Sequence, residues 1–252
     1  MNRALHAEWT KLRTVAGAGR LLLLAVVVTV GVGAILTTTL TCPYGRCGQD
    51  SVKLAFSGVQ ASQACVALLA VLAVGGEYST GMIGVTLAAV PRRGRVLAAK
   101  AVVVTVLTAA AATVAVLASA LAARLILPGS GYPALSPEDG ATLRAAAGSV
   151  LYLVLVGLLS VGVAVAVRDP AASIAVVLGL LYLLPLLAVM VSDPGWHRFL
   201  WSLAPMNAGL AVQATVGVSG LPIQPWAGLG VLAAWAAAAL LAGGLLLRSR
   251  DA

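Results

Sequence analysis

The sequence has few charged side chains. Its 252 residues include 16 Lys and Arg and 8 Asp and Glu, so charged types make up 10% of the chain and hydrophobic types 61%. A soluble domain carries roughly 25% charged and 45 to 50% apolar residues. This chain has more apolar surface than one water-soluble core can bury, which excludes an ordinary soluble protein and indicates an integral membrane protein.

Alternation of apolar and polar residues with period two is also absent, which argues against a membrane β-barrel. Several apolar runs are instead long enough to cross about 30 Å of hydrocarbon as a helix, which takes roughly 20 residues. Only Arg124, near the end of the third run, interrupts them with a charge. The sequence predicts an all-α protein of one transmembrane domain (1–252) with six spans, at Leu21 to Leu40, Leu54 to Gly76, Ala101 to Leu127, Ala145 to Val167, Pro170 to Val191 and Trp226 to Leu247.

Lysine and arginine are distributed unevenly among the segments between the spans. With a cytoplasmic N-terminus, eleven of the 16 lie inside and five outside. The inside set is Arg3, Lys11, Arg13, Arg20, Arg92, Arg93, Arg95, Lys100, Arg168, Arg248 and Arg250, and the outside set is Arg46, Lys53, Arg124, Arg144 and Arg198. The positive-inside rule therefore predicts that both termini are cytoplasmic. The net charge of +8 is a topology signal first and an attraction to anionic lipid second. Nucleic-acid binding is not expected because the chain has no soluble basic face.

Acidic, basic and histidine side chains are missing from the middle of every predicted span, and the two histidines, His6 and His197, lie outside the spans. An ionisable group at the bilayer centre costs about 2.5 to 3.5 kcal/mol on insertion scales, so such groups mark proton relays and intramembrane catalytic sites. The serines and threonines of the spans also have no base as a partner. We therefore expect no enzymatic activity and no metal site in this chain.

Three polar residues of the second predicted span, Ser57, Gln60 and Gln63, lie on one side of the helix. An amide facing hydrocarbon would be unpaired, so these side chains should face another helix or a wet cavity. They either form interhelical hydrogen bonds or line a substrate path. In the fifth span, Pro185 removes a backbone hydrogen bond and predicts a kink.

The first outside loop contains Cys42 and Cys47 in CPYGRC, where oxidising conditions permit a disulfide. The pair is either such a link or two idle thiols. Cys65, in the second span, is read as a small apolar residue.

Two further segments are apolar without being clear spans. Residues 1–17 place Leu5, Trp9, Leu12 and Ala16 on one stripe, which predicts a helix lying in the membrane interface; the alternative is a disordered basic tail. Residues 192–225 include a charge-free stretch rich in proline, glycine and amides, which favours a re-entrant outer segment. A seventh span would place the C-terminal arginines outside, against the charge rule.

The stretch GGEYSTGMIGVTLAAVPRRGRVLAAK, residues 75–100, separates the second and third spans. Its apolar residues at helical spacing predict a short cytoplasmic helix over 77–91, with Glu77 near its start, Ser79 or Thr80 as its cap and Pro91 at its end. Such a helix is about 20 Å long and too short to cross the bilayer. Either the membrane surface or another protein must cover it.

This stretch is similar to the signature region of bacterial type-2 ATP-binding-cassette (ABC) export permeases. Three other segments also resemble that family: AEWTKLRT near the start, LAPMNAGLAV before the last span and LLLRSRDA at the end. Each motif alone is weak, but the four occur in the family's order on a six-span chain.

The resemblance implies a membrane subunit that pairs with a second permease copy in the bacterial plasma membrane, as a homodimer or heterodimer. Its coupling helix would lie in a groove of an ABC ATPase subunit. This chain has no G-x-x-x-x-G-K-[ST] phosphate loop, so ATP and Mg²⁺ would be bound by the partner ATPase and no cofactor by this chain. The implied coupling residues are Glu77, Tyr78, Thr80, Gly81, Met82, Ile83 and Val85, with Arg168 and Asp169 as a second, minor contact.

Two other functions stay open from the residues alone. An ion-coupled secondary transporter would be expected to show a mid-membrane ionisable residue or an inverted repeat, and the sequence has neither. A membrane immunity protein without its own ATPase is the other. The cargo, whether a small molecule, a lipid or a peptide, is not implied by the resemblance.

Overall fold

A computed structural model of the 252-residue chain describes residues 9–10, 16–40, 49–82, 93–130, 132 and 139–249. Within these ranges the regular structure is helical throughout and no strand is present. The predicted all-α fold class is therefore confirmed. Most of the predicted interfacial helix (1–17), the cysteines Cys42 and Cys47, and most of the predicted coupling helix lie outside the described residues.

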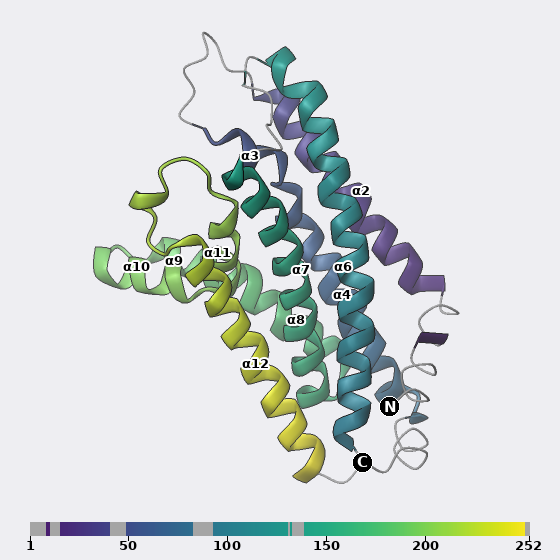
Figure 1. The fold of residues 1–252 in the computed structure, drawn as a ribbon. Coiled ribbons are helices and arrows are strands. Elements are labelled where there is room, and N and C mark those ends of the chain that lie inside the picture. The colour runs from purple at the N-terminus through teal and green to yellow at the C-terminus, as the bar shows by residue number, and fades with distance from the viewer. Residues whose placement is uncertain are drawn as a thin grey trace.

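Six helices are long and apolar enough to span a membrane, as predicted. They run alongside one another as a bundle in Figure 1. The spans consist of α2 (Ala16–Thr39), α3 and α4 (Ser51–Ala55 and Gly58–Ser79), α6 (Arg93–Ile126), α7 (Gly140–Val167), the series α8, η3 and α9 (Pro170–Leu178, Gly179–Leu183 and Leu184–Met190), and α12 (Pro225–Ser249). A short 3₁₀ turn, η2 (Leu127–Ser130), follows α6.

Two spans differ from a simple apolar helix. The 34 residues of α6 correspond to about 51 Å, well beyond the hydrocarbon thickness, because the helix begins within the basic cluster and includes Arg95 and Lys100. The fifth span contains a π-helical turn, Gly179–Leu183, directly before Pro185. Proline lacks an N–H and clashes with the carbonyl four residues earlier, and the wider π turn accommodates both defects.

The scarce aspartates begin helices. Asp50, Asp139, Asp169 and Asp193 each accept a hydrogen bond from a backbone N–H in the first turn of α3, α7, α8 and α10. In α8 and α10 a proline follows the aspartate, where its missing N–H is not needed. All four aspartates within the described ranges therefore satisfy helix N-termini and are not arranged as a catalytic set.

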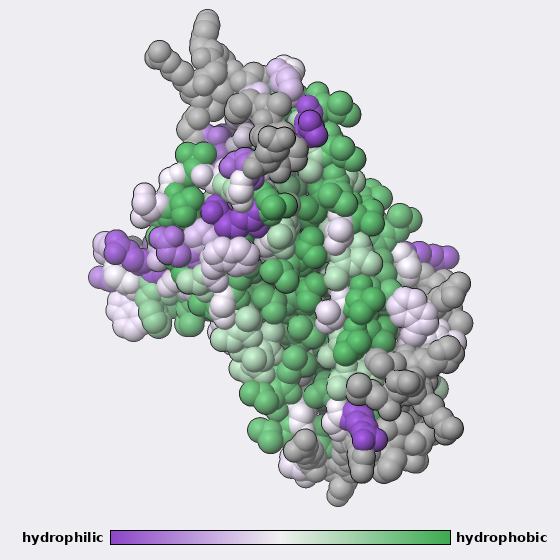
Figure 2. Space-filling model, in the orientation of Figure 1, coloured by the Kyte–Doolittle hydropathy of each residue, from purple (hydrophilic) through white to green (hydrophobic). Residues whose placement is uncertain are grey.

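The centre of the bundle is formed by α4 and α7. More than half of the residues in their most apolar stretches are buried, whereas in the other four spans at most a third are buried. Glycines let neighbouring helices approach closely: a Cβ on Gly162 of α7 would lie 2.5 Å from the backbone of Ala239 in α12. Exposed leucines such as Leu23 in α2 and Leu125 in α6 cover the outside, as expected of a lipid-facing surface. Figure 2 shows apolar residues over the middle of the bundle and hydrophilic residues over α10 and toward the two ends.

Residues 192–225 form no helix long enough to span a membrane. They contain α10 (Pro194–Leu203), α11 (Pro205–Leu210) and two 3₁₀ turns, η4 (Ala211–Gln213) and η5 (Val218–Gly220). In Figure 1, α9 and α10 run across the direction of α6 and α7, and α11 and η4 pack against α7 and α12. The segment thus packs on the bundle without adding a seventh span, in line with the six-span prediction.

Candidate functional site

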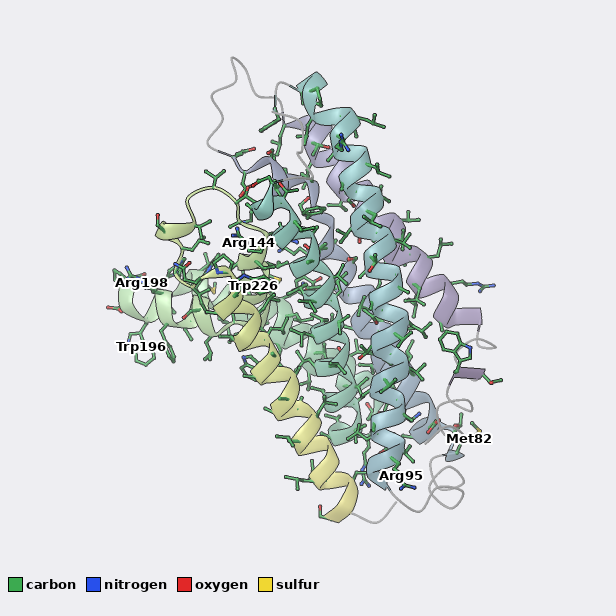
Figure 3. The ribbon with its side chains drawn as sticks, viewed as in Figure 1. Met82, Arg95, Arg144, Trp196, Arg198 and Trp226 are labelled. Atoms are coloured by element: carbon green, nitrogen blue, oxygen red, sulfur yellow. The ribbon has the colours of Figure 1, made fainter. Side chains whose placement is uncertain are left out.

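The bundle has two ends, which are named here after one acidic residue at each. The Glu77 end is where α4, α7 and α12 finish and α6 and α8 begin, and the Asp50 end is the opposite one, where α3 and α7 begin. In Figure 3, Met82 and Arg95 mark the Glu77 end, while Arg144 lies toward the Asp50 end.

Glu77 and Tyr78 belong to α4, which continues to Ser79. The structure therefore differs from the prediction of a separate helix beginning at residue 77: the carboxylate lies near the C-terminus of a long helix, where the helix dipole disfavours a negative charge. A cation compensates. Lys100 Nζ lies 2.9 Å from Glu77 Oε1, and the two side chains are only 3% and 7% exposed. Lys100 also donates to the carbonyl of Ala73, 3.3 Å away.

Arg168 joins the same cluster from α7. Its guanidinium carbon lies 5.8 Å from the centroid of the Tyr78 ring, a cation–π distance. Its Nη2 donates to the carbonyl of Leu246 in α12 at 3.2 Å. Arg168 ends α7 in the left-handed conformation with φ of 66°, and Asp169 begins α8 by accepting from the N–H of Ala172 at 2.7 Å. Glu77, Tyr78, Lys100 and Arg168 are called the Glu77 cluster below.

The end of α4 also touches α8 directly. A Cβ on Gly75 would lie 2.9 Å from the Cβ of Pro170, so only glycine permits this approach. With the ion pair to α6, the ring contact to α7 and the Arg168 bond that continues to α12, the last turns of α4 are linked to four helices. A displacement of this end is therefore shared by most of the bundle.

Beyond the Glu77 cluster the chain reaches the surface. Thr80 donates to the carbonyl of Gly76 at 2.7 Å, and Gly81 has φ of +70°, a conformation that glycine adopts without strain. Met82 is helical again and its side chain is 47% exposed. Ile83 and Val85, the other predicted coupling residues, lie outside the described residues. Among the predicted coupling residues, the structure brings Glu77, Tyr78 and Arg168 together. Thr80, Gly81 and Met82 lie beside them at the surface and are called the exposed step.

Further along α4, Gln63 is fully buried and forms interhelical hydrogen bonds. Tyr152 of α7 donates to its Oε1, and its Nε2 lies 3.1 Å from Met206 Sδ in α11. A second buried amide, Gln213, donates to Ser149 Oγ at 2.9 Å and to the carbonyl of Phe56 at 3.3 Å. Of the two alternatives for the polar face of the second span, interhelical bonding thus describes Gln63.

Ser57 and Gln60 behave differently from Gln63. Ser57, which precedes α4, donates to the carbonyl of Leu54 at the end of α3 at 2.8 Å. Gln60 is exposed, its backbone carbonyl accepts from Tyr182 at 2.9 Å, and its side chain lines a cavity of about 210 Å³. Only Gln60 of the three is therefore placed where it can meet a ligand.

Sequence reasoning missed several members of these clusters. It assigned Lys100 to topology alone and did not single out Tyr152 or Met206. The position of Lys100 could have predicted its ion pair. It lies inside a helix, seven residues after the start of α6, where a lone cation needs a partner.

Among the described residues, no group of three or more His, Cys, Asp or Glu side chains is placed to hold a metal ion. Cys65 is buried and unbonded. No protein-family model and no curated protein matches the chain.

Proposed function

We propose that this chain is the membrane-spanning permease subunit of an ATP-binding-cassette exporter, driven by a separate ATPase subunit. The observation that carries the proposal is the Glu77 cluster: a buried ion pair and cation–π contact lie directly beside an exposed step, Thr80 to Met82, at the point where the sequence resembles the family's coupling region.

In this proposal the ATPase holds the segment that begins at Gly81, and the Glu77 cluster transmits its movement. Rigid displacement of packed helices is a common switching mode, because packed cores have discrete arrangements and do not deform continuously. The ion pair would carry the movement from α4 to α6, and Arg168 would carry it to α7 and α12. The two central helices, α4 and α7, would then alter the path between two permease copies.

The burial of Glu77 defines its role within the proposal. Because its side chain is 7% exposed and paired, it positions the coupling segment and does not itself contact the ATPase. Met82 is the described side chain that the partner would meet, and Asp169, exposed at the start of α8, would add the second, minor contact. The Glu77 end would face the cytoplasm, consistent with the positive-inside rule.

Substitution of Gly81 tests the proposal. Gly81→Pro forces φ to about −65° and cannot keep the observed +70°, whereas Gly81→Asn retains access to positive φ. The chain is expressed with a candidate ABC ATPase subunit, and ATP-dependent efflux and co-purification of the two proteins are measured. Gly81→Pro should abolish both while membrane insertion is unchanged, and Gly81→Asn should retain them.

A cysteine at position 82 gives an independent test. In a chain whose native Cys42, Cys47 and Cys65 are replaced by Ser, Met82→Cys should cross-link to the ATPase and should react with an impermeant thiol reagent only from the cytoplasmic side. Leu125→Cys, exposed near the other end of α6, is the control that should not cross-link. Normal efflux by Gly81→Pro, or labelling of the Met82→Cys variant from outside the cell, would contradict the proposal.

A further inference from the structure

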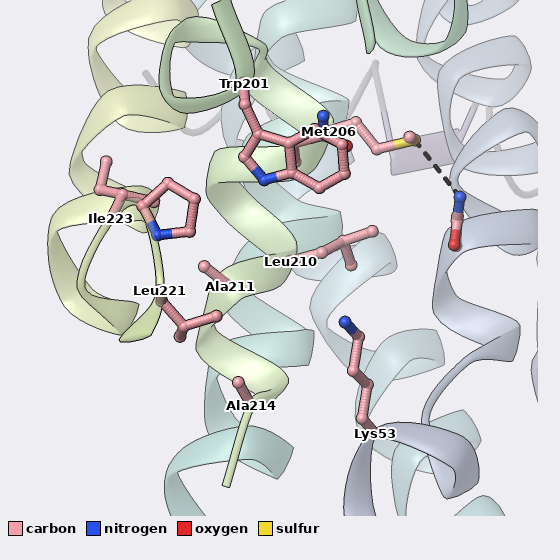
Figure 4. A pocket seen from close by; sticks show the side chains of 11 residues that line it. Lys53, Trp201, Met206, Leu210, Ala211, Ala214, Leu221 and Ile223 are labelled. Atoms are coloured by element: carbon pink, nitrogen blue, oxygen red, sulfur yellow. Dashed lines mark hydrogen bonds between the residues drawn. The ribbon is translucent and has the colours of Figure 1, made fainter. Parts of the chain in front are cut away.

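A cavity of about 210 Å³ lies between α3 and α4 on one side and the segment from α10 to η5 and its following turn on the other. Figure 4 shows Lys53 extending toward α11, with Trp201 and Met206 at the opposite wall. The dashed contact in the figure is the 3.8 Å approach of Gln60 Nε2 to Met206 Sδ. The Glu77 cluster contributes no residue to this cavity.

Three polar side chains line the cavity, and each of them carries a hydrogen-bond donor. Lys53 supplies an ammonium group, Gln60 an amide held only by a long contact to sulfur, and Asn207 an amide whose buried Nδ2 has no hydrogen-bond partner among the described residues. Lys53 and Gln60 can therefore donate to a ligand that brings acceptor oxygens, and a rotation of the Asn207 side chain would bring its unpaired Nδ2 to the same ligand. No carboxylate lines the cavity.

The carboxylate of Asp50, three residues before Lys53 in the chain, is bonded to other groups and forms no ion pair with the ammonium of Lys53. The carboxylate of Asp50 accepts from the N–H groups of Val52 and Lys53 and from Thr215 and Val216, so its oxygens are occupied by the backbone and one hydroxyl. No described carboxylate forms an ion pair with the ammonium of Lys53. A second cation, Arg144, donates to the carbonyl of Ala214 in the cavity wall at 2.6 Å. Among the described residues that line the cavity, Lys53 is the only charged one.

The rest of the lining is apolar and leads outward. Leu210, Leu221 and Ile223 are each partly exposed and continue the cavity toward the surface. A volume of 210 Å³ equals that of about seven waters and is smaller than a typical drug-sized pocket of roughly 300 Å³ or more. It accommodates a charged headgroup but not a whole amphiphile.

We propose that this cavity binds the headgroup of an acidic amphiphile, a phosphate or carboxylate attached to an apolar chain. Lys53 pairs with the anion, the amides of Gln60 and Asn207 donate to its oxygens, and the chain lies along Leu221 and Ile223. If the amphiphile is the transported cargo, this inference rests on the proposed exporter function. Binding of the amphiphile to the cavity does not depend on that function, because binding requires no ATPase.

The test uses the purified full chain in nanodiscs of phosphatidylcholine. The probe is a long-chain alkyl phosphate that carries a photoactivatable diazirine, and the matched neutral probe is the alcohol with the same chain. Labelled peptides are identified by mass spectrometry, and affinity is measured by competition with the unlabelled alkyl phosphate. The variants are Lys53→Gln, Lys53→Arg and Asn207→Asp, with Arg198→Gln as the control, since Arg198 is exposed on α10 and does not line the cavity.

The phosphate probe should label residues 199–225, and the alcohol should label them at least about tenfold less, because a charge-assisted bond contributes about one order of magnitude or more in affinity. Lys53→Gln should weaken binding about tenfold. Lys53→Arg and Arg198→Gln should bind normally, and Asn207→Asp should abolish binding by repulsion. Equal labelling by both probes, or unchanged affinity in Lys53→Gln, would overturn the inference.

Competition separates the two sources of such a ligand. If phosphatidylglycerol displaces the probe, the site holds a membrane lipid; if only the soluble alkyl phosphate displaces it, the site accepts a free amphiphile. Loss of binding with normal coupling to the ATPase would reject the cavity assignment alone, and normal binding without coupling would reject the proposed function alone.

Discussion

The two ends of the bundle are held together by different chemistry. At the Glu77 end, side chains from separate long helices meet: Glu77 with Lys100 across α4 and α6, and Tyr78 with Arg168 across α4 and α7. At the Asp50 end, one carboxylate binds mainly to backbone. Asp50 caps α3 and accepts from Thr215 and Val216, which tie the turn after η4 to the start of the second span.

This difference determines how far a disturbance spreads. Breaking a contact between long helices changes their relative positions, and the Glu77 cluster connects α4 with α6, α7 and α12. Breaking the Asp50 contacts frees a short segment whose neighbours, η4 and α11, remain packed on α7 and α12. We therefore expect global effects at the Glu77 end and local effects at the Asp50 end.

Removing the lysine of the ion pair should have the largest effect. Lys100→Met removes the cation that pairs with the buried Glu77, and loss of one partner of a buried pair costs about 3 to 5 kcal/mol. The double variant Glu77→Leu/Lys100→Met removes both charges and should recover most of this loss, because apolar pairs often replace buried ion pairs without penalty. Thermal unfolding in detergent measures both variants.

The contrast between the single and double variants is the decisive comparison. The single variant Glu77→Leu completes the comparison. If the double variant is less stable than the unmodified protein by the sum of the losses in Glu77→Leu and Lys100→Met, the two side chains do not interact and the ion pair is not what holds α4 to α6. A double variant that is stable but does not export would additionally separate the cluster's role in stability from its role in coupling.

Substitution at the other end should cost less and act locally. Asp50→Asn keeps the size of the side chain but loses charge-assisted hydrogen bonds to five donor groups of four residues, which we expect to cost about 1.5 to 3 kcal/mol. Hydrogen exchange should accelerate at residues 214–224 and stay unchanged in α6. Asp139→Asn is the matched control, because Asp139 caps only its own helix, α7. Faster exchange throughout the bundle would contradict the distinction between the two ends.

The spans were predictable because hydrocarbon imposes a simple requirement. A long helix without charge satisfies its own backbone in lipid, so hydropathy alone located all six, with boundaries shifted by only a few residues in most cases. The exception is the third span, where α6 continues through Arg95 and Lys100. In the first turns of α6, Lys100 bonds to Glu77 and to the carbonyl of Ala73 in α4. A hydropathy pattern does not reveal such contacts between helices.

The end of α4 was harder to predict, because the apolar pattern continues across it. Glu77 was taken as the start of a short helix, although Thr80 and Gly81 carry the signal of a helix end: a glycine with positive φ directly follows the C-cap. The pairing of Glu77 with Lys100 joins residues 23 positions apart and depends on how α4 and α6 pack. The cavity, likewise, is formed by residues from 53 to 223 and has no local pattern.

Substitution of Tyr78 should change stability least, and it tests the contact between the Tyr78 ring and Arg168 apart from the ion pair of the Glu77 cluster. Tyr78→Phe keeps the ring face below Arg168 and removes a buried hydroxyl that has no hydrogen-bond partner among the described residues, so stability should be unchanged or slightly higher. Tyr78→Leu removes the cation–π contact and should cost about 1 kcal/mol. Both are measured by thermal unfolding beside Lys100→Met. If Tyr78→Phe is as unstable as Tyr78→Leu, the hydroxyl and not the ring holds α7 to α4, and the cation–π contact would not be what joins Arg168 to the Glu77 cluster.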